Sequence, residues 1–172
     1  MTGAGGGPRG AATTVTAAEA RGRLREALGA LRRITGSQRL DRLIAERSGV
    51  PIGFAAVAVL GHVIESGPLR MSELAEVGRV HPAALTRQVQ ALEAEGYVAR
   101  SVDPDDGRAW VVEATRSGRA AHQRVERVND EIMAGQLDDW SADDLDRLAD
   151  VLDRLITDLR ADPTSRRRSE AS

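Results

Sequence analysis

Three histidines and the acids near them are the side chains of this 172-residue chain that could hold a metal or move protons. His62 and Glu65 stand three residues apart, so on a helix both could reach one metal ion. His62 lies in a strongly apolar stretch, however, and a histidine packed in the core explains it better. His81 and His122 are far away in sequence, no nucleophile motif or paired carboxylates stand out, and there is no cysteine for disulfides, thiolate metal sites or redox sensing. We expect no enzyme activity, no metal and no cofactor.

The stretch 82–96 offers a different chemistry, hydrogen bonding to the edges of base pairs. Helical spacing places Leu85, Val89 and Leu92 on one face, which must be buried. The opposite face carries small, polar and basic side chains, namely Ala83, Arg87 and Gln90, flanked by Thr86 and His81. Arginine suits guanine, glutamine suits adenine, and threonine or alanine suits the thymine methyl group. The alternative is an ordinary solvated helix face.

The elements expected around this face form a helix-turn-helix. A short helix at 71–77 and a turn around Gly78 precede the second helix, which Pro82 opens and Gly96 closes. Near the start of the first helix, Ser72 is expected either to donate to a phosphate or to cap the helix, and Arg70 is a further phosphate contact.

A β-hairpin is expected next, because two valine-rich runs at 97–102 and 108–114 flank Asp-Pro-Asp-Asp-Gly at 103–107. Arg108 would stand at the tip of this wing and enter a minor groove or grip a phosphate. Asp106 would support the wing, and an ion pair between Asp106 and Arg108 is the competing interpretation, although both could hold. Thr115 is expected to cap a helix at 116–136.

Apolar helices flank this module on both sides. Leu24, Leu28 and Leu31 recur at helical spacing, and the apolar stretch 52–65 is expected to be the core helix. The last helix has leucines at strict heptad spacing: Leu145, Leu148, Leu152, Leu155 and Leu159. We interpret this stripe as a seam for a partner helix, the alternative being packing against the chain's own first helix.

Composition limits the function classes. A 41% hydrophobic and 29% charged chain is an ordinary globular one, and it has no apolar run of the roughly 20 residues that span a membrane. The N-terminal stretch lacks the apolar segment of a secretory signal, so a soluble cytoplasmic protein is expected. The net charge is −2, and from Arg70 to Arg119 there are seven arginines against eight acids, so the acids must face away from any DNA.

The chain resembles the MarR family of transcriptional regulators over about residues 17–159. The resemblance lies in the segments PLRMSELA (68–75), LTRQV (85–89), LEAEGYVAR (92–100), DPDDGRA (103–109) and TRSG (115–118). Three positions depart from the family pattern: Arg79 stands where a glycine is usual, His81 where the helix cap is often serine, and Gly107 where a second arginine is common.

The resemblance implies a mainly α fold with a small β-hairpin wing, a winged helix-turn-helix flanked by dimerisation helices. The implied organisation is a flexible tail at 1–14, an N-terminal dimerisation region at 15–50, a DNA-binding domain at 51–118, C-terminal dimerisation helices at 119–161 and a tail at 162–172. Leu24 and Leu28 would join the C-terminal leucines in the dimer.

The function implied is a repressor that binds palindromic double-stranded DNA as a homodimer and responds to a small-molecule effector, without a membrane. Four side chains are candidates to line the effector pocket: Phe54, His62, Tyr97 and Trp110. A winged helix that binds proteins or shapes DNA without a specific operator is the alternative.

Overall fold

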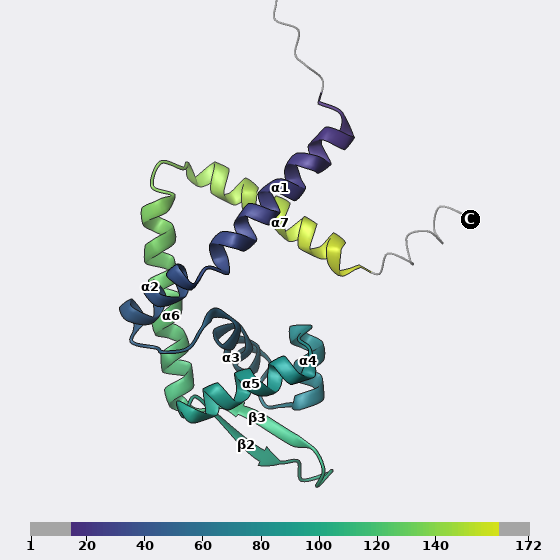
Figure 1. Cartoon of the computed structure of the whole chain (residues 1–172), viewed down its shortest axis with the longest axis vertical. Helices are drawn as coiled ribbons and strands as arrows, with labels where there is room; N and C mark the ends of the chain where they lie inside the picture. The colour runs from purple at the N-terminus through teal and green to yellow at the C-terminus, as the bar shows by residue number, and fades with distance from the viewer. Residues whose placement is uncertain (1–14, 162–172) are drawn as a thin grey trace, which may run out of the picture. The chain divides into compact units, whose positions relative to one another are not determined.

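The computed structural model describes residues 15–161 (Figure 1), so the tails expected at 1–14 and 162–172 lie outside the described residues. The chain divides into two compact units, Met1–Val125 and Glu126–Ser172. Its elements follow in the order α1 (Ala17–Thr35), α2 (Gln38–Ser48), α3 (Phe54–Ser66), β1 (Leu69–Arg70), α4 (Met71–Gly78), α5 (Pro82–Ala94), β2 (Val98–Val102), β3 (Trp110–Ala114), α6 (Arg116–Gln136) and α7 (Ala142–Arg160).

Helix boundaries follow from side chains that satisfy the free backbone groups at helix ends. Thr16 accepts a hydrogen bond from the Glu19 amide at 3.2 Å, while the Glu19 carboxylate accepts from the Thr16 amide at 2.8 Å. Ser141 accepts from the Asp144 amide at 3.1 Å and thereby starts α7.

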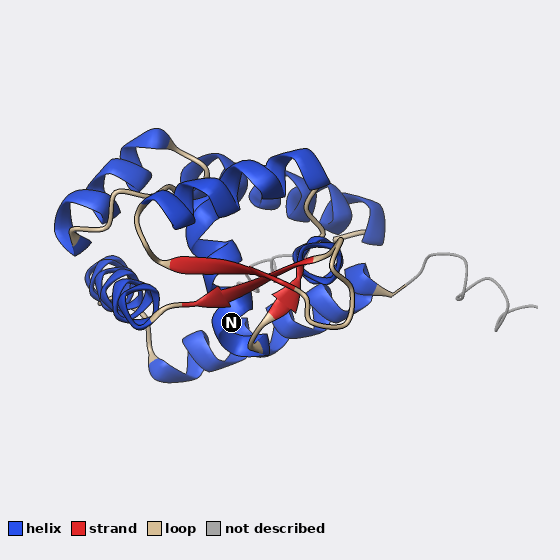
Figure 2. Cartoon of the chain, turned by 90° about the horizontal axis from the view of Figure 1, so that it is seen from below, coloured by secondary structure: helices blue, strands red, loops and turns tan. Residues whose placement is uncertain are grey.

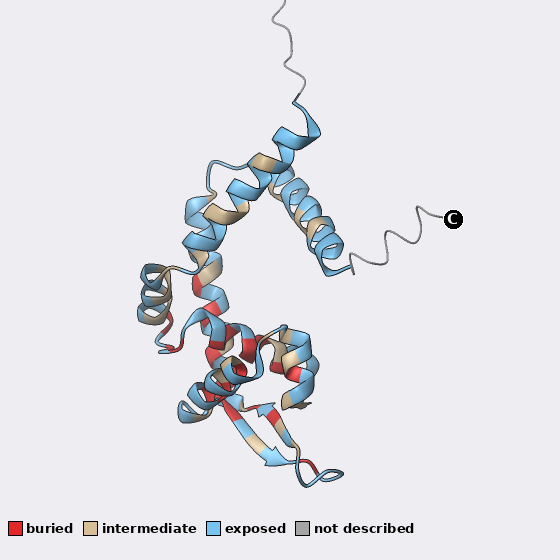
Figure 3. Cartoon of the chain, turned by 45° about the vertical axis from the view of Figure 1, so that its right-hand side comes forward, coloured by how far each residue is buried: buried red, intermediate tan, exposed pale blue. Residues whose placement is uncertain are grey.

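The core of the first unit is built around α3. Its buried residues pack with the inner faces of α4 and α5 and with the sheet, and they include Val59, Leu60 and Val63. Leu85, Val89 and Leu92 of α5 are buried as the spacing predicted, at 1% exposure or less. Figure 3 shows the buried residues gathered on these elements and on the start of α6. This packing holds α5 so that its opposite face meets solvent.

The sheet has three antiparallel strands in the order β1-β3-β2 (Figure 2). β2 and β3 form the expected hairpin, with Val98 opposite Ala114 and Val102 opposite Trp110. β1 is a two-residue strand that the sequence did not indicate, and it pairs Leu69 with Val112. Because β1 directly precedes α4, it ties the start of the helix-turn-helix to the wing.

The turn between α4 and α5 differs from the one expected around Gly78. Gly78 is the last helical residue, and Arg79 adopts the left-handed conformation, with φ of 48°. The Val80 amide donates to the Ala75 carbonyl at 3.1 Å, which closes α4 as a Schellman motif does. A Cβ atom at Gly78 would lie 3.2 Å from Val80 Cγ2, so the glycine serves close packing while an arginine bears the strained backbone.

We predict that Arg79→Gly is more stable than Arg79→Ala by about 1 kcal/mol, because only glycine enters the left-handed region without a steric cost. Both variants remove the guanidinium, so their difference isolates the backbone term. Urea unfolding of the two proteins measures it. Equal midpoints would show that the turn is not strained at this residue.

Candidate nucleic-acid interface

The exposed face of α5 is intact as a surface that could read bases. Ala83, Thr86, Arg87 and Gln90 are all exposed. The Thr86 hydroxyl donates to the Pro82 carbonyl at 2.9 Å, which leaves the position able to offer its methyl group to a partner. His81 has a second role, because its Nδ1 accepts from the Ala83 amide at 3.3 Å and so caps the helix.

The start of α4 corrects one sequence interpretation. The N-cap residue is Arg70, whose amide donates to Glu73 Oε2 at 2.8 Å. Glu73 therefore performs the capping that was considered for Ser72. Ser72 lies exposed in the first turn of the helix, which keeps it as a candidate phosphate contact.

Arg70 has a structural partner that local spacing did not reveal. Its Nε atom lies 2.5 Å from Oδ2 of Asp103, whose side chain is only 7% exposed. The other oxygen of Asp103 accepts from the amides of Asp105 and Asp106 at 2.8 and 3.3 Å. One carboxylate thus folds the wing turn and attaches it to the base of α4.

This pair shifts the titration of both groups. The hydrogen bond from Arg70, followed by the one from the Asp105 amide, holds the pKa of Asp103 below its ordinary value, and the same pair raises the pKa of Arg70. Because its pKa is lowered in the folded state, the ionised Asp103 carboxylate stabilises the fold. This stabilisation is fully present at pH values above the ordinary pKa of 3.8, and it is lost as the pH falls through the lowered pKa. The wing is therefore fully anchored at neutral pH.

Asp106 supports the wing through the backbone. Its Oδ1 accepts from the Arg108 amide at 3.1 Å, and its carbonyl accepts from the Ala109 amide at 2.8 Å. The ion pair considered between the Asp106 and Arg108 side chains does not form in residues 15–161. Arg108 consequently presents its guanidinium to solvent at the tip of the hairpin that Figure 1 shows leaving the core.

The four residues considered for an effector pocket lie in four different environments. Phe54 is 56% exposed at the start of α3, whereas Tyr97 is buried at the root of the hairpin. His62 packs against the turn at Gly78, where a Cβ atom would lie 3.6 Å from His62 Cδ2. Trp110 lies on the wing beneath Arg100. An effector pocket lined by these four residues stays a prediction.

Metal clusters and membrane spans are both absent from residues 15–161. No group of three or more histidine, aspartate or glutamate side chains in this range is arranged to hold a metal ion. None of its helices is both long and apolar enough to cross a membrane.

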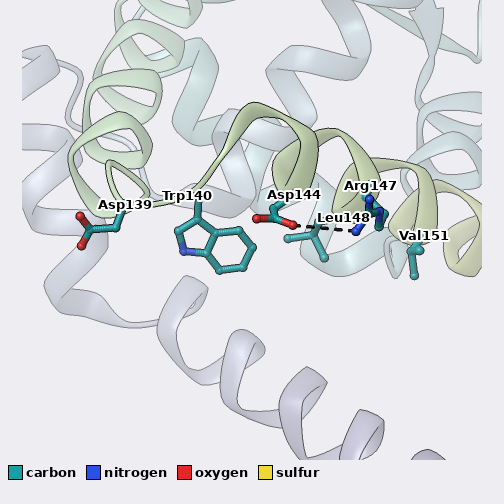
Figure 4. A pocket seen from close by; sticks show the side chains of 6 residues that line it. All are labelled: Asp139, Trp140, Asp144, Arg147, Leu148 and Val151. Carbon is teal, nitrogen blue, oxygen red and sulfur yellow. Dashed lines mark ion pairs between the residues drawn. The ribbon is translucent and has the colours of Figure 1, made fainter.

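The second unit carries an apolar surface of its own. α7 has no buried residue, and Val151 and Leu159 are 60% and 68% exposed. A groove of about 380 Å³ runs between the end of α6 and α7 and is lined by Met133, Ala134, Leu137, Leu145, Leu148, Ala149 and Leu152. A hollow beside it contains Trp140, with Arg147 Nη1 4.0 Å from Asp144 Oδ1 (Figure 4).

Comparison with known proteins supports one family. Residues 50–109 match the family model described as "MarR family". The chain is 31% identical over 97 residues to the HTH-type transcriptional regulator YxaD of Bacillus subtilis. The matched region covers 56% of this chain and 68% of that protein. It is 27% identical over 119 residues to the HTH-type transcriptional regulator MT0903.1 of Mycobacterium tuberculosis, covering 69% and 83%.

Solved structures agree with the sequence matches. The transcriptional regulator BldR of Sulfolobus solfataricus has the same fold, with a TM-score of 0.71 over 83% of this chain and 99% of that one, at 22% identity. A mutant MarR of E. coli in complex with operator DNA gives a TM-score of 0.59 at 26% identity, over 78% and 91%. The winged helix-turn-helix expected from the sequence is confirmed. This chain belongs to the MarR family of DNA-binding transcriptional regulators.

Proposed function

We propose that the protein is a repressor that binds a palindromic operator as a homodimer and that a small molecule releases it. In this proposal α5 enters the major groove, the wing follows the adjacent minor groove, and two copies address two half-sites. The observation that carries the proposal is the division of α5 into one fully buried face and one face of exposed polar side chains.

The charges of the module support this use, although acids outnumber arginines in it. Three acids are occupied within the fold: Glu73 caps α4, Glu93 pairs with Arg100, and Asp103 pairs with Arg70. Arg87 and Arg108, by contrast, have no hydrogen-bond or ion-pair partner for their guanidinium groups within residues 15–161. Arg87 on α5 and Arg108 at the wing tip are therefore available to a polyanion, so DNA binding should depend on where the cations lie more than on net charge.

The homodimer is supported by the apolar surface of the second unit. Leucines at heptad spacing on an exposed helix lose contact with water only if another helix covers them. α7 has six aspartates and three arginines, a net charge of −3, so a second α7 laid along it would be repelled. α1 has five arginines and two glutamates, a net charge of +3. These charges favour an α1 over a second α7 as the helix that covers α7, and in the proposed dimer it is the partner's α1.

Release by a small molecule rests on membership of the family, whose regulators commonly respond to aromatic or anionic ligands. A gel shift on the bound operator with a panel of aromatic carboxylates tests this part separately. Loss of the shifted band with one of them is the expected result, and an unaffected band across the panel would remove the effector from the proposal.

We predict that Arg87→Ala weakens operator binding by about 1–3 kcal/mol and relaxes the preference at one base pair of each half-site. The physical reason is the loss of a bidentate donor aimed at a base edge. Arg39→Ala is the matched control, since it removes an exposed arginine of α2, outside the helix-turn-helix. A titration in which both variants bind with wild-type affinity and base preference would reject Arg87 as a reading residue.

A further inference from the structure

The inner face of the wing carries apolar side chains beyond the core. Side chains alternate along a strand, so Trp110 points to the same side of the sheet as Val112 and Ala114, and its partner Val102 points to that side too. Val112 is fully buried, but Val102 and Trp110 are each 49% exposed. The apolar face of the sheet thus continues past the core toward the wing tip and ends in solvent.

Trp110 is held in a defined orientation there. The guanidinium carbon of Arg100 lies 5.5 Å from the centre of the Trp110 ring, a cation–π contact. Nη2 of the same arginine is 2.6 Å from Oε2 of Glu93 on α5. Its Nε atom is buried without a hydrogen-bond partner, so the position of the side chain across the ring carries the desolvation penalty of one unsatisfied donor. Glu93 and Arg100 therefore connect the ring of Trp110 to the helix that would read the major groove.

The location of this ring indicates its partner. Trp110 follows Arg108 by two residues, so their Cα atoms are at most about 7 Å apart. A DNA groove wall touched by Arg108 is therefore within reach of an indole ring on the same hairpin. Deoxyribose presents an apolar surface in the minor groove, and proteins that enter that groove often place apolar side chains in it.

We propose that the exposed part of the Trp110 ring packs against deoxyribose of the duplex that the wing contacts, with Arg100 and Glu93 as positioning residues. The inference rests on the proposed docking of the wing on operator DNA. It adds an uncharged contact to a wing whose other contact is ionic. Such a contact raises affinity without releasing counterions, so it leaves the salt dependence of binding unchanged.

The two tryptophans of the chain, Trp110 and Trp140, permit a direct test. In Trp140→Phe the only indole is Trp110, and in Trp110→Phe the only indole is Trp140. Each protein is titrated with a labelled duplex enriched from a random pool, whose anisotropy reports binding, and quenching of indole fluorescence by iodide is measured with and without DNA. We expect DNA to protect Trp110 from iodide and to leave Trp140 unchanged.

The possible outcomes distinguish failure of the proposed DNA binding from failure of the proposed Trp110 contact. Absence of any anisotropy change would reject DNA binding by the wing and this inference with it. Full binding with unchanged iodide access to Trp110 would overturn the inference alone and leave the proposed function in place. If Trp110 is already shielded from iodide by protein atoms before the duplex is added, its ring is not free to contact DNA. Low iodide quenching of Trp110 in the DNA-free protein would therefore also overturn the inference.

Affinity measurements distinguish a contact from a purely structural role. Trp110→Ala should weaken binding about tenfold with the slope of log K against log salt unchanged, whereas Arg108→Ala should reduce that slope by about one. Arg100→Gln should increase iodide access to Trp110 in the free protein and weaken binding, while Trp110→Phe should retain most of the affinity. Wild-type affinity of a folded Trp110→Ala protein, checked by circular dichroism, would overturn the inference.

Discussion

We expect the replacement of Leu152 by aspartate to yield monomers and to lower operator affinity by about 100-fold or more, because each half-site would then be bound alone. Leu152 lies in the leucine stripe of α7 and lines the groove shared with the end of α6. A carboxylate placed in that seam would lose its hydration without gaining a partner, and a homodimer would carry the change twice. Analytical ultracentrifugation of the variant measures the oligomeric state directly.

Two companion variants make this test decisive. Thr157→Asp adds the same charge to α7 at an exposed position outside the leucine stripe, and it should remain dimeric. Because Leu152 also packs within the second unit, Leu159→Asp repeats the test at a residue that is 68% exposed and whose loss cannot unfold the chain by core disruption. Intact dimers of both leucine variants would show that α7 is not the seam.

Gly118→Ala destabilises the protein by about 3 kcal/mol, the largest stability effect that we expect from one methyl group. Hydroxyl groups at the start of α6 hydrogen-bond to the backbone at Gly96 and Tyr97 and hold the first turn of the helix close to it. Thr115 and Ser117 each donate to the Gly96 carbonyl at 2.7 Å, and the Thr115 amide donates to the Tyr97 carbonyl at 3.0 Å. A Cβ atom on Gly118 would collide with the Tyr97 carbonyl oxygen and lie 2.8 Å from its carbonyl carbon.

These neighbours are backbone atoms, so the clash cannot be relieved by a side-chain rotation. Gly135→Ala is the control in the same helix. Apart from the adjoining residues and the backbone of its own helix turn, no atom lies within 4 Å of a Cβ placed there. The control should gain up to about 0.5 kcal/mol from helix propensity. Thermal and urea unfolding measure both, and equal stabilities would show that the approach of α6 to Tyr97 is looser than described.

The parts of the fold that sequence could predict are those encoded by local punctuation. Pro82 and the Asp-Pro-Asp-Asp-Gly turn restrict the backbone of their own residues, so the second motif helix and the hairpin could be located from them. The buried face of α5 followed from the spacing of Leu85, Val89 and Leu92. Each of these signals depends on neighbours within one turn or one helix face.

The features that sequence analysis missed depend on residues far apart in the chain. Arg70 and Asp103 are 33 positions apart, and nothing local to either residue indicates the partner. β1 consists of two residues and exists only because β3 offers it a partner. The left-handed backbone of Arg79 was not predicted, because glycine is the usual residue in that conformation and an arginine gives no such signal.

Selection of duplex DNA from a random pool by the full chain tests the central claim most directly. We expect enrichment of an inverted repeat whose half-site centres lie about one helical turn, 10–10.5 base pairs, apart or at a multiple of that distance. The base pair read by Arg87 should lose its preference when Arg87→Ala is put through the same selection. A wild-type protein that enriches no sequence, or only single half-sites, would contradict the account.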